Sequence, residues 1–191
     1  MDQKSNCVNL IITGNPGVGK HTIAELLQKE STSYQLLDIS KFAIERNFGK
    51  KVEDGIEIDT IKLKDEIKKI VTNDSLIVGH LAPYVFDESI IDLVIVLRKN
   101  PYDLLEIYKQ RKYEEMKIKE NTGSEILGVI ANDSIKSFGK GKTFEIDATK
   151  KTPGEIVKEI NQIINSMKGG NVVDWLTMVE EKKDMSRFFD Y

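Results

Sequence analysis

Three glycines, a lysine and a threonine lie close together early in the chain, in a pattern that could bind phosphate. The stretch reads Gly14-Asn15-Pro16-Gly17-Val18-Gly19-Lys20-His21-Thr22. Glycine adopts backbone angles that other residues resist, so successive N–H groups of such a loop can turn toward one anion. The Lys20 ammonium can reach the outer phosphates of a nucleotide. The spacing predicts a phosphate-binding loop over residues 14–22, and the alternative is a glycine-rich turn.

The patterns on either side of this loop are those that such a site needs. Residues 8–12 form an apolar run typical of a buried strand, and apolar residues from Ile23 to Leu27 recur with helical spacing. A helix that begins at the loop adds its free N–H groups and its dipole to an anion site. Thr22 is expected either to contact the α-phosphate or to bond to the backbone of the first helical turn.

The residue after Lys20 departs from the usual phosphate-loop pattern. Ser or Thr normally stands there and presents a hydroxyl to Mg²⁺, whereas this chain has His21 followed by Thr22. The order Gly-x-Pro-Gly-x-Gly-Lys-x-Thr resembles that of adenylate kinases, which carry Gly-Lys-Gly-Thr and hold the metal largely through water and phosphate. No Asn-Lys-x-Asp motif for guanine occurs in the chain. Both features favour nucleoside-phosphate kinases over regulatory GTPases.

Strands and helices are predicted to alternate along the chain. Besides residues 8–12, strands are expected at 34–37, 76–78, 93–97 and 144–147, and helices at 40–47, 63–71, from 101, 121–137 and 153–167. The strands at 76–78 and 93–97 are apolar on successive residues, as strands covered on both faces require. We expect the polar segment 49–57 to be a mobile connection. The prediction is an α/β fold with a five-stranded parallel sheet and helices on both faces.

Composition excludes several other classes of protein. The 191 residues carry a net charge of −3, which argues against a large nucleic-acid interface. One cysteine, Cys7, excludes an internal disulfide, and the presence of only two histidines argues against a histidine-rich metal site. No apolar run approaches the length of a membrane span. Residues 1–6 are polar, unlike a signal peptide, so a cytoplasmic location is expected.

Polar residues at the ends of the expected strands are further candidates for the site. Asp38 could hold the water shell of a metal or cap the helix that begins near Ser40. His80 follows a strand end, where open α/β sheets bind ligands, although it could instead be a hydrogen-bonded histidine under a loop. Arg98 ends another strand. Arg111 is the best candidate for a phosphate contact within a basic segment that could also be a solvated helix face: Lys109, Arg111, Lys112, Lys117 and Lys119.

The order of these and other residues resembles the type-six adenylate kinases, also called the coilin-interacting nuclear ATPase family, and particularly their archaeal members. The matching residues span about residues 8 to 165. Besides the loop they are Asp38-Ile39-Ser40, Ala43, Glu45, Asp59, Leu63, Gly79-His80-Leu81, Leu97-Arg98, Pro101, Leu104, Arg111, Tyr113, Lys117-Ile118, Glu120-Asn121 and Glu125-Ile126.

The resemblance implies a three-layer P-loop nucleoside-phosphate-kinase fold over residues 1–168. It places a segment that binds the nucleoside monophosphate at about 38–72 and a lid at about 107–125. It implies transfer of the γ-phosphoryl group of ATP, with Mg²⁺, to AMP or a related monophosphate, together with ATPase activity. Residues 15–22 would bind ATP. The catalytic residues would be Lys20, His80 and Arg111. The monophosphate would contact Asp38 and Arg98, and Asp38 would also reach the metal through water. It also implies a part in small ribosomal subunit maturation, with a ribosomal protein of the subunit platform as partner.

Two departures from the family pattern keep other functions open. Val78 stands where members carry Asp, which puts Mg²⁺ handling in question, and Ile107 and Lys112 replace the Arg and Gly of the lid. A nucleotide-switched assembly factor with weak catalysis is therefore one alternative. A P-loop kinase of another small acceptor, such as shikimate, is a second.

The chain continues with an amphipathic extension at 171–191. Val172, Trp175, Leu176 and Val179 recur with helical spacing, and an aromatic tail of Phe188, Phe189 and Tyr191 follows. This extension is expected either to pack onto the parent domain or to dock a partner, because exposed Trp and Phe are enriched at interfaces.

Overall fold

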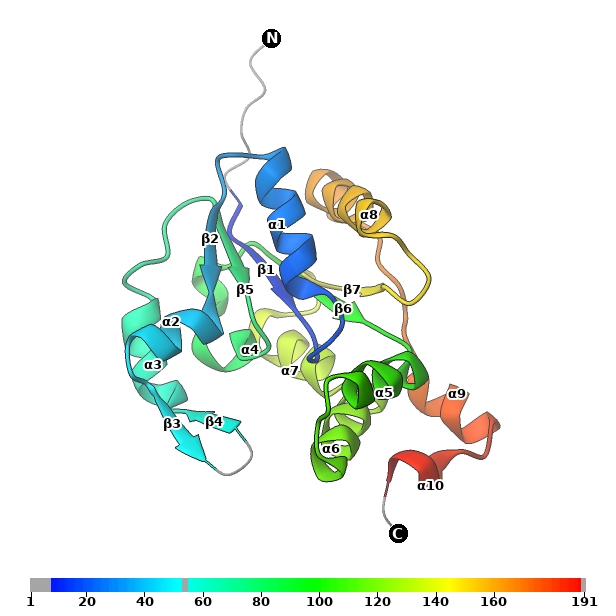
Figure 1. The fold of residues 1–191 in the computed structure, drawn as a ribbon. Helices are drawn as coiled ribbons and strands as arrows, with labels where there is room; N and C mark the ends of the chain where they lie inside the picture. Colours follow the sequence, from blue (N-terminus) through cyan, green and yellow to red (C-terminus); the bar gives the residue numbers. More distant parts are fainter. Residues whose placement is uncertain (1–7, 53–54, 190–191) are drawn as a thin grey trace.

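The computed structural model describes residues 8–52 and 55–189 and contains the expected five-stranded parallel sheet, in the order β2-β5-β1-β6-β7 (Figure 1). The strands are β1 (Leu10–Thr13), β2 (Gln35–Asp38), β5 (Ser75–Val78), β6 (Leu93–Arg98) and β7 (Thr143–Asp147). Every residue of β1, β5 and β6 is buried, which explains why these strands are apolar without alternation. Residues 1–6, Cys7 and Tyr191, on which some expectations rest, lie outside the described residues.

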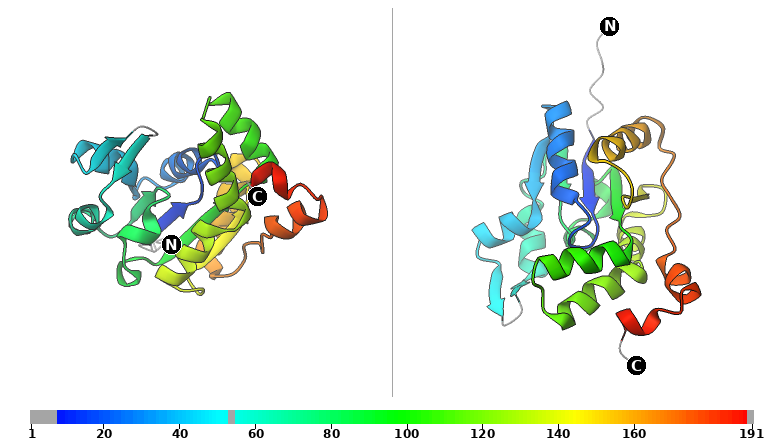
Figure 2. Two further views of the ribbon diagram at one scale, coloured as in Figure 1. Left: turned by 90° about the horizontal axis from the view of Figure 1, so that it is seen from below. Right: turned by 45° about the vertical axis from the view of Figure 1, so that its right-hand side comes forward.

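Two apolar layers cover the two faces of the sheet. On one face, Leu10 and Ile12 of β1 pack in a cluster with residues of α1 (Lys20–Glu30), α5 (Pro101–Gln110) and α8 (Pro153–Ser166). On the other face, Ile11 packs in a cluster with residues of α2 (Ile39–Glu45), α3 (Thr60–Ile67), α4 (Ala82–Val85) and α7 (Val129–Phe138). Figure 2 shows helices on both sides of the sheet from two further directions. The prediction of a covered α/β sheet is confirmed.

The segment expected to be a mobile connection is in part a β-hairpin. Strands β3 (Gly49–Val52) and β4 (Gly55–Ile58) pair antiparallel, with Gly49 opposite Ile58. The hairpin is closed at its base, where the Asp59 amide donates to the Phe48 carbonyl at 2.9 Å. Ile58 packs against the second apolar cluster, which anchors the hairpin to the domain. The prediction was wrong because each strand is only four residues long, with one aliphatic residue in β3 and two in β4, which is too short a pattern to predict a strand.

The helix expected at 121–137 is two helices. The first, α6 (Glu115–Ile126), ends before Gly128, and α7 begins at Val129. Gly128 has a φ of 63°, in the left-handed region, and its amide donates to the Glu125 carbonyl at 3.1 Å. The glycine thus turns the chain between two helices whose apolar stripes follow each other closely enough to resemble one.

The C-terminal extension packs onto α5 and α6. Its helices are α9 (Trp175–Glu181) and α10 (Met185–Phe188), and Val179 and Phe188 are buried in a cluster with Ile126 of α6. The expected helical stripe began three residues too early: Asp174 caps α9 by accepting from the Thr177 amide at 2.9 Å, and Val172 is 99% exposed. Of the two expectations for the extension, the structure shows packing onto the parent domain.

A short helical turn, η1 (Glu88–Ile90), completes the elements. Within the ranges that the structure describes, no helix combines the length and the apolar character needed to cross a membrane.

Candidate functional site

The loop after β1 is shaped to present backbone N–H groups. Gly14 has a φ of 133°, and a Cβ at this position would lie 2.3 Å from the Leu97 carbonyl oxygen, so only glycine fits. Gly19, with a φ of 100°, stands before the first turn of α1 and makes no side-chain cap. The free N–H groups at the start of an eleven-residue helix therefore face the space in front of the loop.

A cavity of about 350 Å³ lies in front of this loop and gathers most of the expected site residues. Its lining consists of Pro16, Gly17, Gly19, Lys20, His21, Thr22, Ser40, Gly79, His80 and Arg111. Ser40 and Gly79 were not predicted as site residues. Gly79 directly follows β5 and precedes His80, and Ser40 is two residues after Asp38 at the end of β2, so the rule that ligands bind at strand ends could have found both.

Lys20 is the buried cation of the cavity. Only 7% of its surface is exposed, and its Nζ donates to the Asn15 carbonyl oxygen at 2.8 Å. Burial is the main cause that lowers the pKa of Lys20 to about 8. Glu125 opposes the shift, the Arg111 charge contributes to it, and Asp38 opposes it. Lys20 is therefore protonated at neutral pH but close to losing its charge, and an anion in the cavity would favour the charged form.

His80 is uncharged at neutral pH. Burial lowers the pKa of His80 to about 4, and the nearby Lys20 ammonium adds to the shift. A neutral imidazole offers one hydrogen-bond donor and one acceptor but no charge. At this wall of the cavity it can orient an oxygen atom without competing with Lys20 for negative charge.

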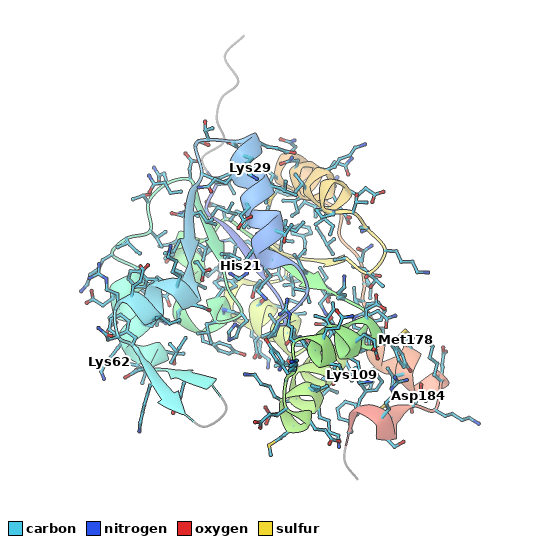
Figure 3. All side chains as sticks on the ribbon, in the orientation of Figure 1. His21, Lys29, Lys62, Lys109, Met178 and Asp184 are labelled. Carbon is cyan, nitrogen blue, oxygen red and sulfur yellow. The ribbon has the colours of Figure 1, made fainter. Side chains whose placement is uncertain are left out.

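His21 and Asp38 join the loop to the end of β2. The His21 Nε2 and the Asp38 Oδ2 are 2.8 Å apart, and Figure 3 shows His21 at the N-terminal end of α1. The other Asp38 oxygen accepts from the Lys41 amide at 3.0 Å and caps α2. The structure thus shows the capping function that was one of two expectations for Asp38. A water-mediated metal contact from Asp38 stays a prediction.

Arg98 does not line the cavity. It is 3% exposed, its Nε donates to Glu125 Oε1 at 2.8 Å and its Nη2 to the Glu125 carbonyl at 2.7 Å, while its Nη1 pairs with Glu145. A contact with a nucleoside monophosphate would require one of these ion pairs to break. The expected role of Arg98 in substrate binding therefore stays a prediction, and the observed role is internal charge pairing.

Glu125 is a residue of this region whose role the sequence did not reveal. Its side chain is fully buried, and its Oε2 accepts from the Asn15 Nδ2 at 2.7 Å. The Asn15 Oδ1 in turn accepts from the Ser124 hydroxyl at 3.1 Å. Asn15 is thus held by two residues of α6, far away in the sequence, and the phosphate loop is fastened to the expected lid.

Helix α5 supports the loop from its other side. The Tyr108 hydroxyl donates to the Pro16 carbonyl at 2.6 Å, and its ring stacks on Tyr113 with centroids 5.4 Å apart. Arg111 follows the last turn of α5 and lines the cavity. Among the basic residues of the expected lid, Lys109 pairs with Glu106 and Lys119 with Glu115. Arg111 is the one that the cavity lining includes.

The protein groups offer little direct ligation for a metal. Across the described parts of the chain, no three His, Cys, Asp or Glu side chains gather in a way that could hold an ion. Val78, where the family pattern has Asp, is 1% exposed and packs in the core. A cation that enters with its nucleotide and is held by phosphate and water, as the loop pattern predicts, stays a prediction.

Comparisons with known proteins agree with this geometry. Residues 10–128 match the family described as an AAA domain. A Saccharolobus islandicus protein named "Putative adenylate kinase" is 36% identical over 170 residues, 87% of each chain. A Pyrococcus abyssi protein of the same name is 34% identical over 175 residues, 90% of this chain and 93% of the relative.

A solved structure supports the fold. The shikimate kinase of Bacteroides thetaiotaomicron superposes with a TM-score of 0.56 at 15% identity, over 83% of this chain and 98% of the other. The phosphate loop, the covered parallel sheet and these relatives lead to one conclusion: the chain belongs to the adenylate-kinase-like family of P-loop kinases represented by the archaeal proteins.

Proposed function

We propose that this protein transfers the γ-phosphoryl group of ATP to AMP or a related nucleoside monophosphate and also hydrolyses ATP. The observation that carries the proposal is the cavity of about 350 Å³, which joins the phosphate-loop backbone, the buried Lys20, Arg111 and the neutral His80. Phosphoryl transfer depends on positioning and on neutralising charge more than on covalent chemistry. This cavity supplies groups that can position a phosphate and groups that can neutralise its charge.

Most residues of the cavity have a part in this reaction. Residues 15–22 bind the polyphosphate, and all of them except Pro16 have a backbone N–H to donate. Lys20 and Arg111 offset the charge that develops on the transferring group. His80 donates one hydrogen bond to a phosphate oxygen or a bound water. Asp38 would accept from the water shell of a Mg²⁺ ion bound with ATP, and that ion would offset further charge.

The direct test is an assay of ADP formation with ATP, Mg²⁺ and AMP. We expect ADP formation that depends on AMP. Without AMP, ATP hydrolysis should still form ADP, but more slowly. The Lys20→Ala variant should lose most of this activity while keeping its fold, because Lys20 makes a single bond to a nearby carbonyl. Turnover no higher than that of Lys20→Ala would overturn the proposal. A screen of other acceptors, shikimate included, tests the alternative acceptor class.

We further propose that the protein is a type-six adenylate kinase that acts in small ribosomal subunit maturation. This rests on the resemblance in motif order, from the phosphate loop through Glu125-Ile126. Tagged protein should retain a ribosomal protein of the subunit platform, and the retained amount should differ between ATP and ADP. Equal retention in both nucleotides, or no retention, would contradict a nucleotide-dependent role.

A second candidate is a nucleotide-switched assembly factor with weak catalysis. It is favoured by Val78, a buried apolar residue where the family pattern has a carboxylate. If the missing acid limits metal handling, Val78→Asp should raise Mg²⁺-dependent turnover. Val78→Asn should not, because asparagine has the size of aspartate without its charge. Unchanged turnover in Val78→Asp would favour the kinase, with Asp38 or water already performing this task.

A further inference from the structure

The C-terminal segment, residues 174–189, is anchored by specific contacts with α5. The Tyr102 hydroxyl donates to Asp184 at 2.8 Å, and the Tyr102 ring meets Phe188 edge-on with centroids 5.2 Å apart. Lys182 lies over the same ring, 4.4 Å from its centroid. Figure 3 labels Met178 and Asp184 in this segment, beside the green helices α5 and α6. The segment is therefore an ordered part of the domain.

Trp175 connects this segment to the phosphate loop. Its indole Nε1 donates to Glu125 Oε1 at 3.1 Å, while Glu125 Oε2 accepts from Asn15 Nδ2 at 2.7 Å. The backbone carbonyl of Asn15 accepts from Lys20 Nζ at 2.8 Å. A continuous hydrogen-bonded chain thus runs from the first residue of α9 through a fully buried carboxylate to the lysine of the nucleotide site.

The buried position of Glu125 gives each of its donors weight. Its carboxylate oxygens accept from Arg98 Nε at 2.8 Å and the Lys99 amide at 3.1 Å as well as from Trp175 and Asn15. A carboxylate without solvent depends on such donors for its charge and its orientation. Removal of the indole N–H leaves Oε1 with two of its three donors, Arg98 Nε and the Lys99 amide, so the carboxylate is held less firmly in the orientation that accepts from Asn15.

We propose that Trp175 is a positioning residue for the nucleotide site, which it holds in its binding-competent shape through Glu125 and Asn15. The inference rests on the proposed function and deepens it: the C-terminal extension sets the nucleotide affinity of the loop. By the reciprocity of linked equilibria, a nucleotide in the cavity also strengthens the attachment of α9.

The test compares Trp175→Phe with Tyr102→Phe. Trp175→Phe keeps an aromatic ring but lacks the N–H, whereas Tyr102→Phe removes a bond that anchors the same segment without touching Glu125. At a temperature where all variants are folded, we expect Trp175→Phe to raise the Kd for ADP and the KM for ATP about three- to tenfold, the range for the net contribution of one typical intramolecular hydrogen bond. Tyr102→Phe should leave both values unchanged.

Hydrogen exchange of the amides in residues 14–20, without nucleotide, supplies an independent measurement. It should be faster in Trp175→Phe than in wild type and unchanged in Tyr102→Phe. Equal exchange and equal ADP affinity in wild type and Trp175→Phe would overturn the inference and leave the kinase proposal standing. Faster exchange in Trp175→Phe, with a wild-type protein that binds no nucleotide, would support the positioning role and overturn the proposed function instead.

Discussion

At the scale of single residues, the buried lysine of the phosphate loop couples nucleotide binding to protons. Lys20 has a pKa near 8 in the free protein because burial disfavours its charge. Below that pH the free site already carries the positive charge that a phosphate needs. Above it, Lys20 must take up a proton when the phosphate binds, and this uptake becomes harder as the pH rises.

The prediction is a loss of ADP affinity at alkaline pH. Between pH 7 and pH 9 the Kd for ADP should rise about tenfold, since one pH unit beyond the pKa deprotonates about nine-tenths of the free sites. Calorimetry in buffers of different ionisation enthalpy should show proton uptake at pH 9. Lys20→Arg stays charged at both pH values, so its Kd for ADP should be the same at pH 7 and pH 9. If the Kd of Lys20→Arg rises as much as that of the wild type, the pH dependence does not come from Lys20.

A second prediction at this scale concerns the buried carboxylate of α6. Glu125→Ala leaves the Arg98 guanidinium buried with Glu145 as its remaining acidic partner, and should lower the free energy of unfolding by about 3–5 kcal/mol. Glu120→Ala, an exposed position on the same helix, should change it by less than about 0.5 kcal/mol. Urea unfolding measures both, and similar values for the two variants would show that Glu125 is dispensable.

At the scale of elements, the turn between α6 and α7 depends on one glycine. Gly128→Ala places a Cβ at a φ of 63° and 3.4 Å from Arg98 Nη1, so it should lower the free energy of unfolding by about 1–2 kcal/mol. Gly141→Ala is the matched control because a Cβ there meets no atom within 4 Å. Thermal unfolding measures both variants, and a lower Tm for Gly141→Ala than for Gly128→Ala would contradict this account.

The same turn shows what the sequence can and cannot predict. The strands of the sheet were predictable because full burial leaves an apolar run, as in β6. The break at Gly128 was not, because apolar residues continue with helical spacing on both sides of it. The loop, Lys20 and Arg111 could be predicted from local motifs. The pairing of Arg98 with Glu125 and Glu145 could not, because its partners lie 27 and 47 residues away and only tertiary packing selects them.

At the scale of the whole molecule, nucleotide binding should stabilise the fold. A ligand at one hundred times its Kd that binds only the folded state adds about 2.7 kcal/mol. In a domain of this size, that corresponds to a rise in Tm of about 5–10 °C. Calorimetric scans with ADP should show this shift in the wild type and not in Lys20→Ala. A shift that survives in Lys20→Ala would place the bound nucleotide outside the proposed cavity.

The position of Trp175 has an optical consequence. It is the only tryptophan of the chain, and its indole N–H bonds to the carboxylate that holds the phosphate loop. Selective excitation of this ring reports on one place in the molecule, with no dye attached. Stopped-flow emission after mixing with nucleotide would therefore follow, on the millisecond scale, how an event at the loop reaches the far end of the chain.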